Sequence, residues 1–244
     1  MNPFGPSPVV VGHRGGRGDG WPPENTLSAF ERARDEGALC VETDVRLCAD
    51  EAVLLHDPTL SRVSGGRDTR TVAEVAYRTL PLVAGNGRAE RVARLSDLLT
   101  WAHRTRMALD VEIKHDVPDR LALVRAVARL IRGAQVPVVF SSFDPLSLAA
   151  LRVLAPRVPS ALLTDPEQKY ARSLHAIVRP PLFSGLIVER RQVNERRVER
   201  WRRRGLMLGV WTVNDAEEAR GLARVGVDLL ITDRPGDLVR ALRA

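Results

Sequence analysis

The chain has 244 residues, enough for one domain with a sizeable core, and its 44% hydrophobic content excludes a mainly disordered protein. Its 37 Lys and Arg outnumber its 30 Asp and Glu, which gives a formal net charge of +7 and favours anionic partners. The densest basic run, residues 189–204, nevertheless interleaves Glu195 and Glu199 with arginines, as the solvated face of a helix does. Nucleic acid is therefore a weak candidate partner.

The first apolar run, Val9–Val11, is far too short for a signal sequence or a membrane span. Cys40 and Cys48 are not spaced like the ligands of a metal ribbon, so two reduced thiols are the expectation. We expect a cytoplasmic protein with no transmembrane segment. Peripheral contact with a membrane, through the arginine-rich run near Trp201, stays open, and no pattern indicates an oligomeric state.

Short aliphatic runs alternate with longer stretches of helical periodicity along the chain, a pattern typical of βα units around a parallel sheet. The predicted strands are Val9–Val11, Cys40–Leu47 with a small partner at Val53–Leu55, Met107–Ile113, Val138–Ser141, Ser160–Thr164, Gly185–Glu189, Leu208–Thr212 and Leu229–Thr232. The predicted helices are Thr26–Glu36, Leu95–Arg104, Pro118–Arg132, Pro145–Leu154, Tyr170–Val178, Val193–Arg204, Ala216–Val225 and Asp237–Leu242.

Eight main strands alternating with eight helices predict an α/β protein with the (β/α)8 architecture of a TIM barrel, as a single domain over residues 1–244. A doubly wound open sheet is the competing architecture, but the first strand is not followed by the Gly-x-Gly-x-x-Gly turn of a dinucleotide-binding domain. The longest connection, residues 57–94, is a short excursion after the second strand and contains Ser64-Gly65-Gly66 and Gly85-Asn86-Gly87. We expect it to form a lid or a wall of a substrate pocket.

Three acidic residues stand within strand sequences, where carboxylates are costly to bury. Glu42 and Asp44 are two residues apart on one predicted strand, so both side chains point to the same side. Glu112 lies on another strand, and Lys114 is two residues beyond it on the same face. Each acid alone would be explained by an arginine partner, but the three together indicate one divalent-metal site with oxygen ligands.

His13 and His56 each follow an apolar run, which places them at strand ends that face the predicted metal site. Imidazole titrates near neutrality, so the pair suggests a general acid and a general base. His103 and His175 fall in predicted helices and His115 points to the other face of its strand, so none of these three is expected to react.

Several blocks of sequence together resemble a known family. They are His13-Arg14-Gly15, Pro23-Glu24-Asn25-Thr26 with Ala29-Phe30, Glu42-x-Asp44-Val45-Arg46, His56-Asp57-x-Thr59-Leu60-x-Arg62, Glu112-Ile113-Lys114, Trp211-Thr212-Val213-Asn214 and Leu230-Ile231-Thr232-Asp233-x-Pro235. In content and in order, from Val10 to about Pro235, these blocks resemble the glycerophosphodiester phosphodiesterases.

The resemblance implies a TIM-barrel hydrolase with a small-molecule substrate. Such an enzyme cleaves a glycerophosphodiester, for example glycerophosphocholine or glycerophosphoethanolamine, to glycerol 3-phosphate and an alcohol. By the family's pattern, Glu42, Asp44 and Glu112 hold one divalent metal ion, either Mg2+ or Ca2+.

The resemblance also implies roles around the metal. His13 and His56 act as acid and base, Arg14 and Lys114 bind phosphate oxygens, and Trp211 walls the glycerol or head-group pocket. The glycerol hydroxyl next to the phosphate attacks first and gives a cyclic phosphate, which water then opens. The residues alone do not distinguish the acid from the base.

Two alternative functions stay open at this point. A lysophospholipase D-type lipid phosphodiesterase would need an apolar ridge at the mouth of the site, to which Phe4, Trp21, Tyr77 and Leu82 are candidates. A noncatalytic phosphate- or lipid-binding barrel is disfavoured, because both histidines and all three acids are present. A barrel that had lost catalytic activity would be expected to lack at least one of these five residues.

Overall fold

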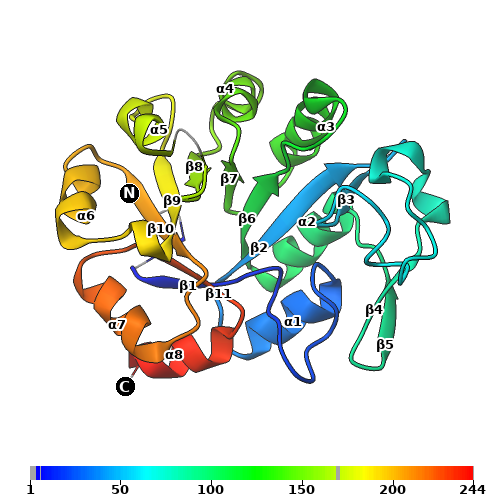
Figure 1. Cartoon of the computed structure of the whole chain (residues 1–244), viewed down its shortest axis with the longest axis horizontal. Coiled ribbons are helices and arrows are strands. Elements are labelled where there is room, and N and C mark those ends of the chain that lie inside the picture. Colours follow the sequence, from blue (N-terminus) through cyan, green and yellow to red (C-terminus); the bar gives the residue numbers. More distant parts are fainter. Residues whose placement is uncertain (1–3, 6, 169–170, 244) are drawn as a thin grey trace.

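A computed structural model of the chain describes residues 4–5, 7–168 and 171–243. In this part of the chain, eight parallel strands close into a barrel (Figure 1): β1 (Val9–Gly12), β2 (Cys40–Leu47), β6 (Ala108–Ile113), β7 (Val138–Ser142), β8 (Ser160–Thr164), β9 (Gly185–Glu189), β10 (Met207–Trp211) and β11 (Leu229–Thr232). Each strand pairs with the next along the chain, and β1 pairs with both β2 and β11, which closes the ring. The predicted TIM barrel is confirmed.

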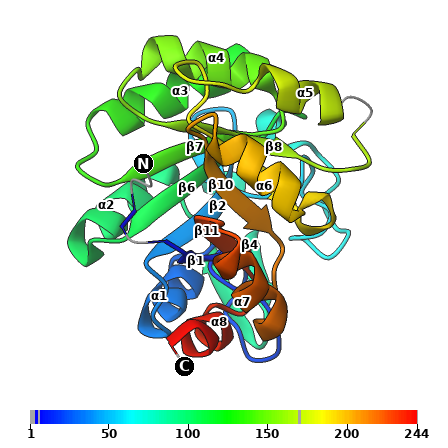
Figure 2. The same ribbon diagram turned by 90° about the vertical axis from the view of Figure 1, so that its left-hand side faces the viewer.

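The helices lie outside the strands, as a second view also shows (Figure 2). They are α1 (Leu27–Asp35), α2 (Leu95–Thr105), α3 (Arg120–Arg132), α4 (Pro145–Leu154), α5 (Ala171–Ile177), α6 (Glu195–Arg202), α7 (Ala216–Arg224) and α8 (Pro235–Arg243). The helix predicted from Tyr170 is present, but Tyr170 itself lies outside the described residues. Helix α8 begins two residues earlier than predicted, at Pro235, because proline fits the first turn of a helix. No described helix combines the length and hydropathy needed to span a bilayer.

Side chains alternate between the barrel interior and the helix layer. Cys40 and Ala108 belong to an apolar cluster inside the barrel, whereas the next residues along, Val41 and Leu109, pack among residues of the helices. Because side chains in a strand repeat every second residue, the second and fourth residues after Cys40 and Ala108 also point inward. Those positions on β2 and β6 are all acidic, and they lie above the apolar interior at the C-terminal end of the barrel.

The excursion after the second strand, residues 57–94, contains short elements of secondary structure. It follows the short strand β3 (Ala52–Leu54), which pairs antiparallel with β2, and contains two 3-10 turns, η1 (Val72–Glu74) and η2 (Tyr77–Thr79), and a hairpin, β4 (Leu82–Gly85) with β5 (Arg88–Arg91). Asn86 and Gly87 both have positive φ, 50° and 75°, as a tight hairpin turn requires. The Asn86 amide donates to the carbonyl oxygen of Trp21 over 2.7 Å, so the hairpin supports the segment between β1 and α1.

Candidate active site

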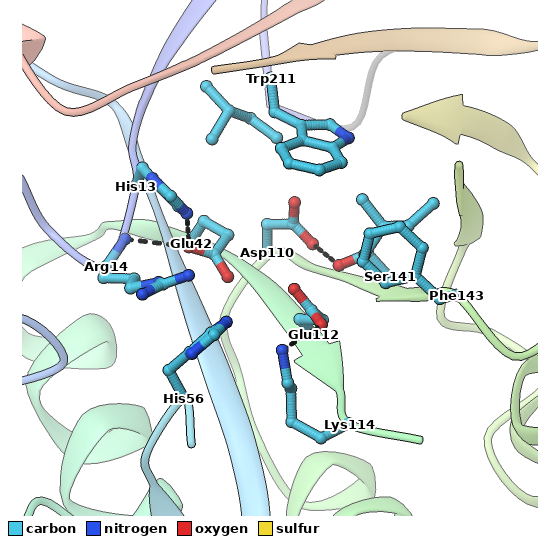
Figure 3. A pocket seen from close by; sticks show the side chains of 12 residues that line it. His13, Arg14, Glu42, His56, Asp110, Glu112, Lys114, Ser141, Phe143 and Trp211 are labelled. Atoms are coloured by element: carbon cyan, nitrogen blue, oxygen red, sulfur yellow. Dashed lines mark hydrogen bonds and ion pairs between the residues drawn. The ribbon is translucent and has the colours of Figure 1, made fainter. Parts of the chain in front are cut away.

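A cavity of about 230 Å³ lies at the C-terminal ends of the barrel strands (Figure 3). It is lined by His13, Arg14, Glu42, His56, Asp110, Glu112, Lys114, Ser141, Phe143, Leu163, Trp211 and Ile231. Seven of the eight residues predicted for the site are in this lining, and the eighth, Asp44, contacts two of them. No lining residue comes from residues 57–94, so the excursion does not form a wall of this cavity, and its role as a lid stays a prediction.

The three predicted metal ligands come together. Glu42, Asp44 and Glu112 are all buried, and each offers an oxygen within 4.8 Å of the others. Strand pairing produces this cluster, because β2 and β6 are neighbours and Asp44 lies opposite Glu112 in their register. Lys114 bridges the two strands: its Nζ donates to Glu112 Oε1 over 2.8 Å and to Asp44 Oδ1 over 3.2 Å.

The acids are held in different electrostatic environments. Burial alone would raise the pKa of Asp44, but Lys114 and Arg14 outweigh it and hold this pKa well below its usual range. Burial, with repulsion from Asp44 and Glu112, raises the pKa of Glu42 well above its usual range. Oε1 of Glu42 is also buried without a hydrogen-bond partner. A divalent cation would neutralise the repulsion and occupy the unpaired oxygen, so this donor set fits a hard metal ion.

Asn25 orients Asp44 within the cluster. Its amide nitrogen donates to Asp44 Oδ2 over 2.8 Å, and its amide oxygen accepts a hydrogen bond from the Thr43 hydroxyl over 2.8 Å. Asn25 has a positive φ of 58°, a conformation that asparagine tolerates better than most residues. Thr26 is the N-cap residue of α1, whereas Asn25 supports the acids.

His13 is a buried histidine whose ring is held in place by a hydrogen bond to a carboxylate. Its Nδ1 lies 2.8 Å from Oδ1 of Asp233, which follows β11, so the proton is on Nδ1 and the Nε2 lone pair is left for the cavity in the neutral ring. Burial lowers the pKa of His13, although the bond to Asp233 opposes that shift. In turn, His13 and Arg17 outweigh burial and hold the pKa of Asp233 well below its usual range.

His56 repeats this arrangement with a different carboxylate. Its Nδ1 lies 2.7 Å from Oδ1 of the next residue, Asp57, so Nε2 is again the ring nitrogen left for the cavity. The two rings differ in exposure, because 37% of the His56 side chain is accessible against 11% for His13. The other histidines lie elsewhere: His103 and His115 are exposed, and His175 bonds to Thr164 at 2.9 Å.

Arg14 places positive charge beside the acids. It stands in a left-handed conformation with φ of 52° at the turn after β1. Its backbone N–H donates to Glu42 Oε2 over 2.9 Å, and its guanidinium pairs with Asp44 at 3.0 Å and with Glu24 at 3.0 Å. The next residue, Gly15, has a φ of +91°, and a Cβ there would lie 2.7 Å from the backbone of Ala29, so only glycine fits this turn.

The other side of the cavity is apolar. Trp211 ends β10, and its ring meets that of Phe143 edge to face at a centroid distance of 5.8 Å. Leu163 and Ile231 complete this wall. Trp211 therefore lies where a pocket wall was predicted, whereas Phe143 was not identified from the sequence, because a single aromatic residue after a strand carries no distinctive pattern.

The four residues named as candidates for an apolar ridge, which a lipid phosphodiesterase would need, do not form one. Trp21 is buried under the guanidinium of Arg32, and Phe4 and Tyr77 pack against core clusters. Of the four candidate residues only Leu82 is strongly exposed, at 52%. Trp21, Phe4 and Tyr77 are therefore not available for such a ridge.

Comparison with known proteins gives consistent matches over nearly the whole chain. The model of the Glycerophosphoryl diester phosphodiesterase family matches residues 13–237. A glycerophosphodiester phosphodiesterase of Caldanaerobacter subterraneus is 28% identical, over 96% of this chain and 98% of its own. A crystal structure of a Silicibacter pomeroyi protein assigned to the same family has a TM-score of 0.87 at 30% identity and covers 99% of this chain and 96% of that one. A phosphodiesterase of Oleispira antarctica, solved with its product sn-glycerol-3-phosphate, has a TM-score of 0.81 at 23% identity, with 97% of each chain covered.

Proposed function

Because the chain belongs to the glycerophosphoryl diester phosphodiesterase family, we propose that it hydrolyses soluble glycerophosphodiesters to glycerol 3-phosphate and an alcohol, with one divalent metal ion and two histidines. The family and the class of phosphoric diester hydrolase, both expected from the sequence, are confirmed. The observation that carries the finer proposal is a cluster of three carboxylates beside a cavity that is also lined by two carboxylate-anchored histidines. A cytoplasmic location stays a prediction.

Glu42, Asp44 and Glu112 are the proposed metal ligands. A bound Mg2+ or Ca2+ supplies positive charge that stabilises the phosphate oxygens as negative charge develops on them. Lys114 and Arg14 are proposed to bind the same oxygens. Both residues already pair with acids, but an ammonium has three donors and a guanidinium five, so each keeps N–H groups for the substrate.

His13 and His56 are the proposed proton-transfer groups. One ring accepts the proton of the glycerol hydroxyl next to the phosphate, whose oxygen then bonds to phosphorus to give a cyclic phosphate. The other ring donates a proton to the departing alcohol oxygen as its bond to phosphorus breaks. The roles reverse when water opens the ring, and the Nδ1 bonds to Asp233 and Asp57 keep Nε2 available throughout.

The test is release of glycerol 3-phosphate from a panel of glycerophosphodiesters and lysophospholipids by the purified protein with Mg2+ or Ca2+. Turnover of the soluble diesters is expected, because the cavity of about 230 Å³ is of small-molecule size. Turnover of lysophospholipids alone would replace this proposal with a lipid phosphodiesterase. No turnover of either class would favour the noncatalytic binding barrel.

Asp233 is a positioning residue in this scheme, because it contacts His13 but does not line the cavity. Asp233→Asn keeps the size of the side chain and removes the charge that stabilises the protonated ring. We expect kcat to fall about 10–100-fold while KM changes little. The control is Asp237→Asn, the same change on the exposed face of α8, which is expected to keep wild-type kcat. A rise in KM with kcat unchanged would contradict the assigned role.

A further inference from the structure

The floor of the cavity carries one acid that the proposed chemistry does not use. Asp110 on β6 is completely buried, and its Oδ1 accepts a hydrogen bond from the Ser141 hydroxyl over 2.6 Å. Its Oδ2 is buried with no hydrogen-bond partner. Buried polar atoms are nearly always satisfied in folded proteins, so an unpaired oxygen that lines a cavity indicates a group that binds there.

Strand geometry places Asp110 below the proposed metal ligands. It lies two residues after Ala108, which belongs to the apolar interior, and two residues before Glu112. It is therefore deeper in the barrel than Glu112, at a separation of about 6.6 Å along the strand. In the register of β2 and β6 it lies opposite Glu42. Figure 3 shows its carboxylate beneath the ring of Trp211, with one oxygen directed to Ser141.

The surroundings of Asp110 indicate which kind of chemical group would bind to it. None of the ion pairs in the described part of the chain includes Asp110, and the nearby cations, Arg14 and Lys114, pair with other acids. The neighbouring walls, from Trp211, Leu163 and Ile231, offer apolar contact. A small hydrogen-bond donor attached to a short carbon chain matches this combination, because its carbons pack on the walls and its hydroxyl satisfies Oδ2.

We propose that Asp110 accepts a hydrogen bond from the terminal hydroxyl of the glycerol moiety and is thereby a specificity-determining residue. This inference rests on the proposed function, which places the phosphate at Glu42, Asp44 and Glu112. The hydroxyl next to the phosphate must stay close to phosphorus in order to attack it. The far end of the three-carbon chain is then free to extend to the cavity floor, while the departing alcohol leaves through the mouth.

The test compares two ligands that differ only in this hydroxyl, sn-glycerol 3-phosphate and propane-1,2-diol 1-phosphate. Their binding to the full-length protein with Mg2+ is measured by calorimetry. The wild type is expected to bind glycerol 3-phosphate about 10–100-fold more tightly, within the range for leaving a buried hydrogen-bonding group without its partner. Asp110→Ala is expected to bring the two dissociation constants to within about threefold of each other, chiefly by weakening glycerol 3-phosphate.

The matched control is Asp35→Ala, the same change at an exposed position at the end of α1, and it is expected to keep the wild-type preference. If Asp110→Ala does not fold, as judged by circular dichroism, the near-isosteric Asp110→Asn replaces it and is expected to reduce the preference at least threefold. Equal affinity for the two ligands in the wild type would overturn the proposal. So would a variant that weakens both ligands equally and keeps the preference, because that result indicates a general effect on the phosphate site.

Turnover of glycerophosphodiesters by the wild type separates this inference from the proposed function. If the wild type turns over substrate but does not prefer glycerol 3-phosphate to propane-1,2-diol 1-phosphate, the role of Asp110 is refuted and the proposed hydrolase stands. If the wild type shows the binding preference but no turnover, and the Asp110 variant loses that preference, the proposed hydrolase is refuted and the role of Asp110 in binding stands. Failure of the wild type to bind either ligand would overturn both.

Discussion

Replacing His13 or His56 with alanine is expected to lower kcat on glycerophosphodiesters by about 10²–10⁴-fold, the usual contribution of a positioned acid or base. Each ring has Nδ1 committed to a carboxylate and Nε2 left for the cavity, so each variant loses one proton-transfer group. Steady-state release of glycerol 3-phosphate measures the loss. His103→Ala is the matched control, because His103 is exposed on α2 and does not line the cavity.

A substrate with an activated leaving group separates the acid from the base. A p-nitrophenyl ester departs without needing a proton, so the variant that lacks the general acid is expected to lose much less activity on it than on glycerophosphocholine. The variant that lacks the general base is expected to lose a similar factor on both substrates. A histidine variant with near-native kcat on glycerophosphocholine would remove that histidine from the mechanism.

The sequence was sufficient to predict the barrel and the cluster of the three acids, for physical reasons. Buried parallel strands are short aliphatic runs, so their order and number could be recognised. Period-two alternation then placed Glu42 and Asp44 on one face, and the same rule, applied to β6, would have shown that Asp110 shares the face of Glu112. Asp110 was not predicted, because it lies inside the strand and outside the block Glu112-Ile113-Lys114 that indicated a site.

Contacts between distant segments could not be predicted in the same way. Asp233 reaches His13 across 220 positions in the chain, and nothing local to either residue specifies that bond. The hairpin at Asn86-Gly87 had a turn signal, but Arg88–Arg91 lacks the apolar alternation of a strand. The direction of the excursion depended on tertiary contacts such as Asn86 to Trp21, so its length could not show whether it lines the cavity.

Removing divalent metal is expected to abolish turnover, and adding Mg2+ or Ca2+ after removal of the chelator is expected to restore it. The physical reason lies in the acid cluster, because burial and mutual repulsion raise the pKa of Glu42 in the absence of a cation. A bound cation should therefore also stabilise the fold, by about 2.7 kcal/mol when its concentration is 100 times its Kd. Thermal unfolding with increasing Mg2+ or Ca2+, in parallel with activity, measures both effects.

Glu112→Gln tests which residues produce the metal dependence. The change keeps the size of a proposed ligand and removes its charge, so both the metal-dependent rise in Tm and the activity are expected to fall sharply. Glu189→Gln is the matched control, since Glu189 is also a buried acid at the C-terminal end of a barrel strand but does not line the cavity. It should retain the metal response of the wild type. Activity that is indifferent to chelator, together with a Tm that does not depend on metal, would refute the assignment of Glu42, Asp44 and Glu112 as metal ligands. The three acids would then form a network held by Arg14, Lys114 and Asn25.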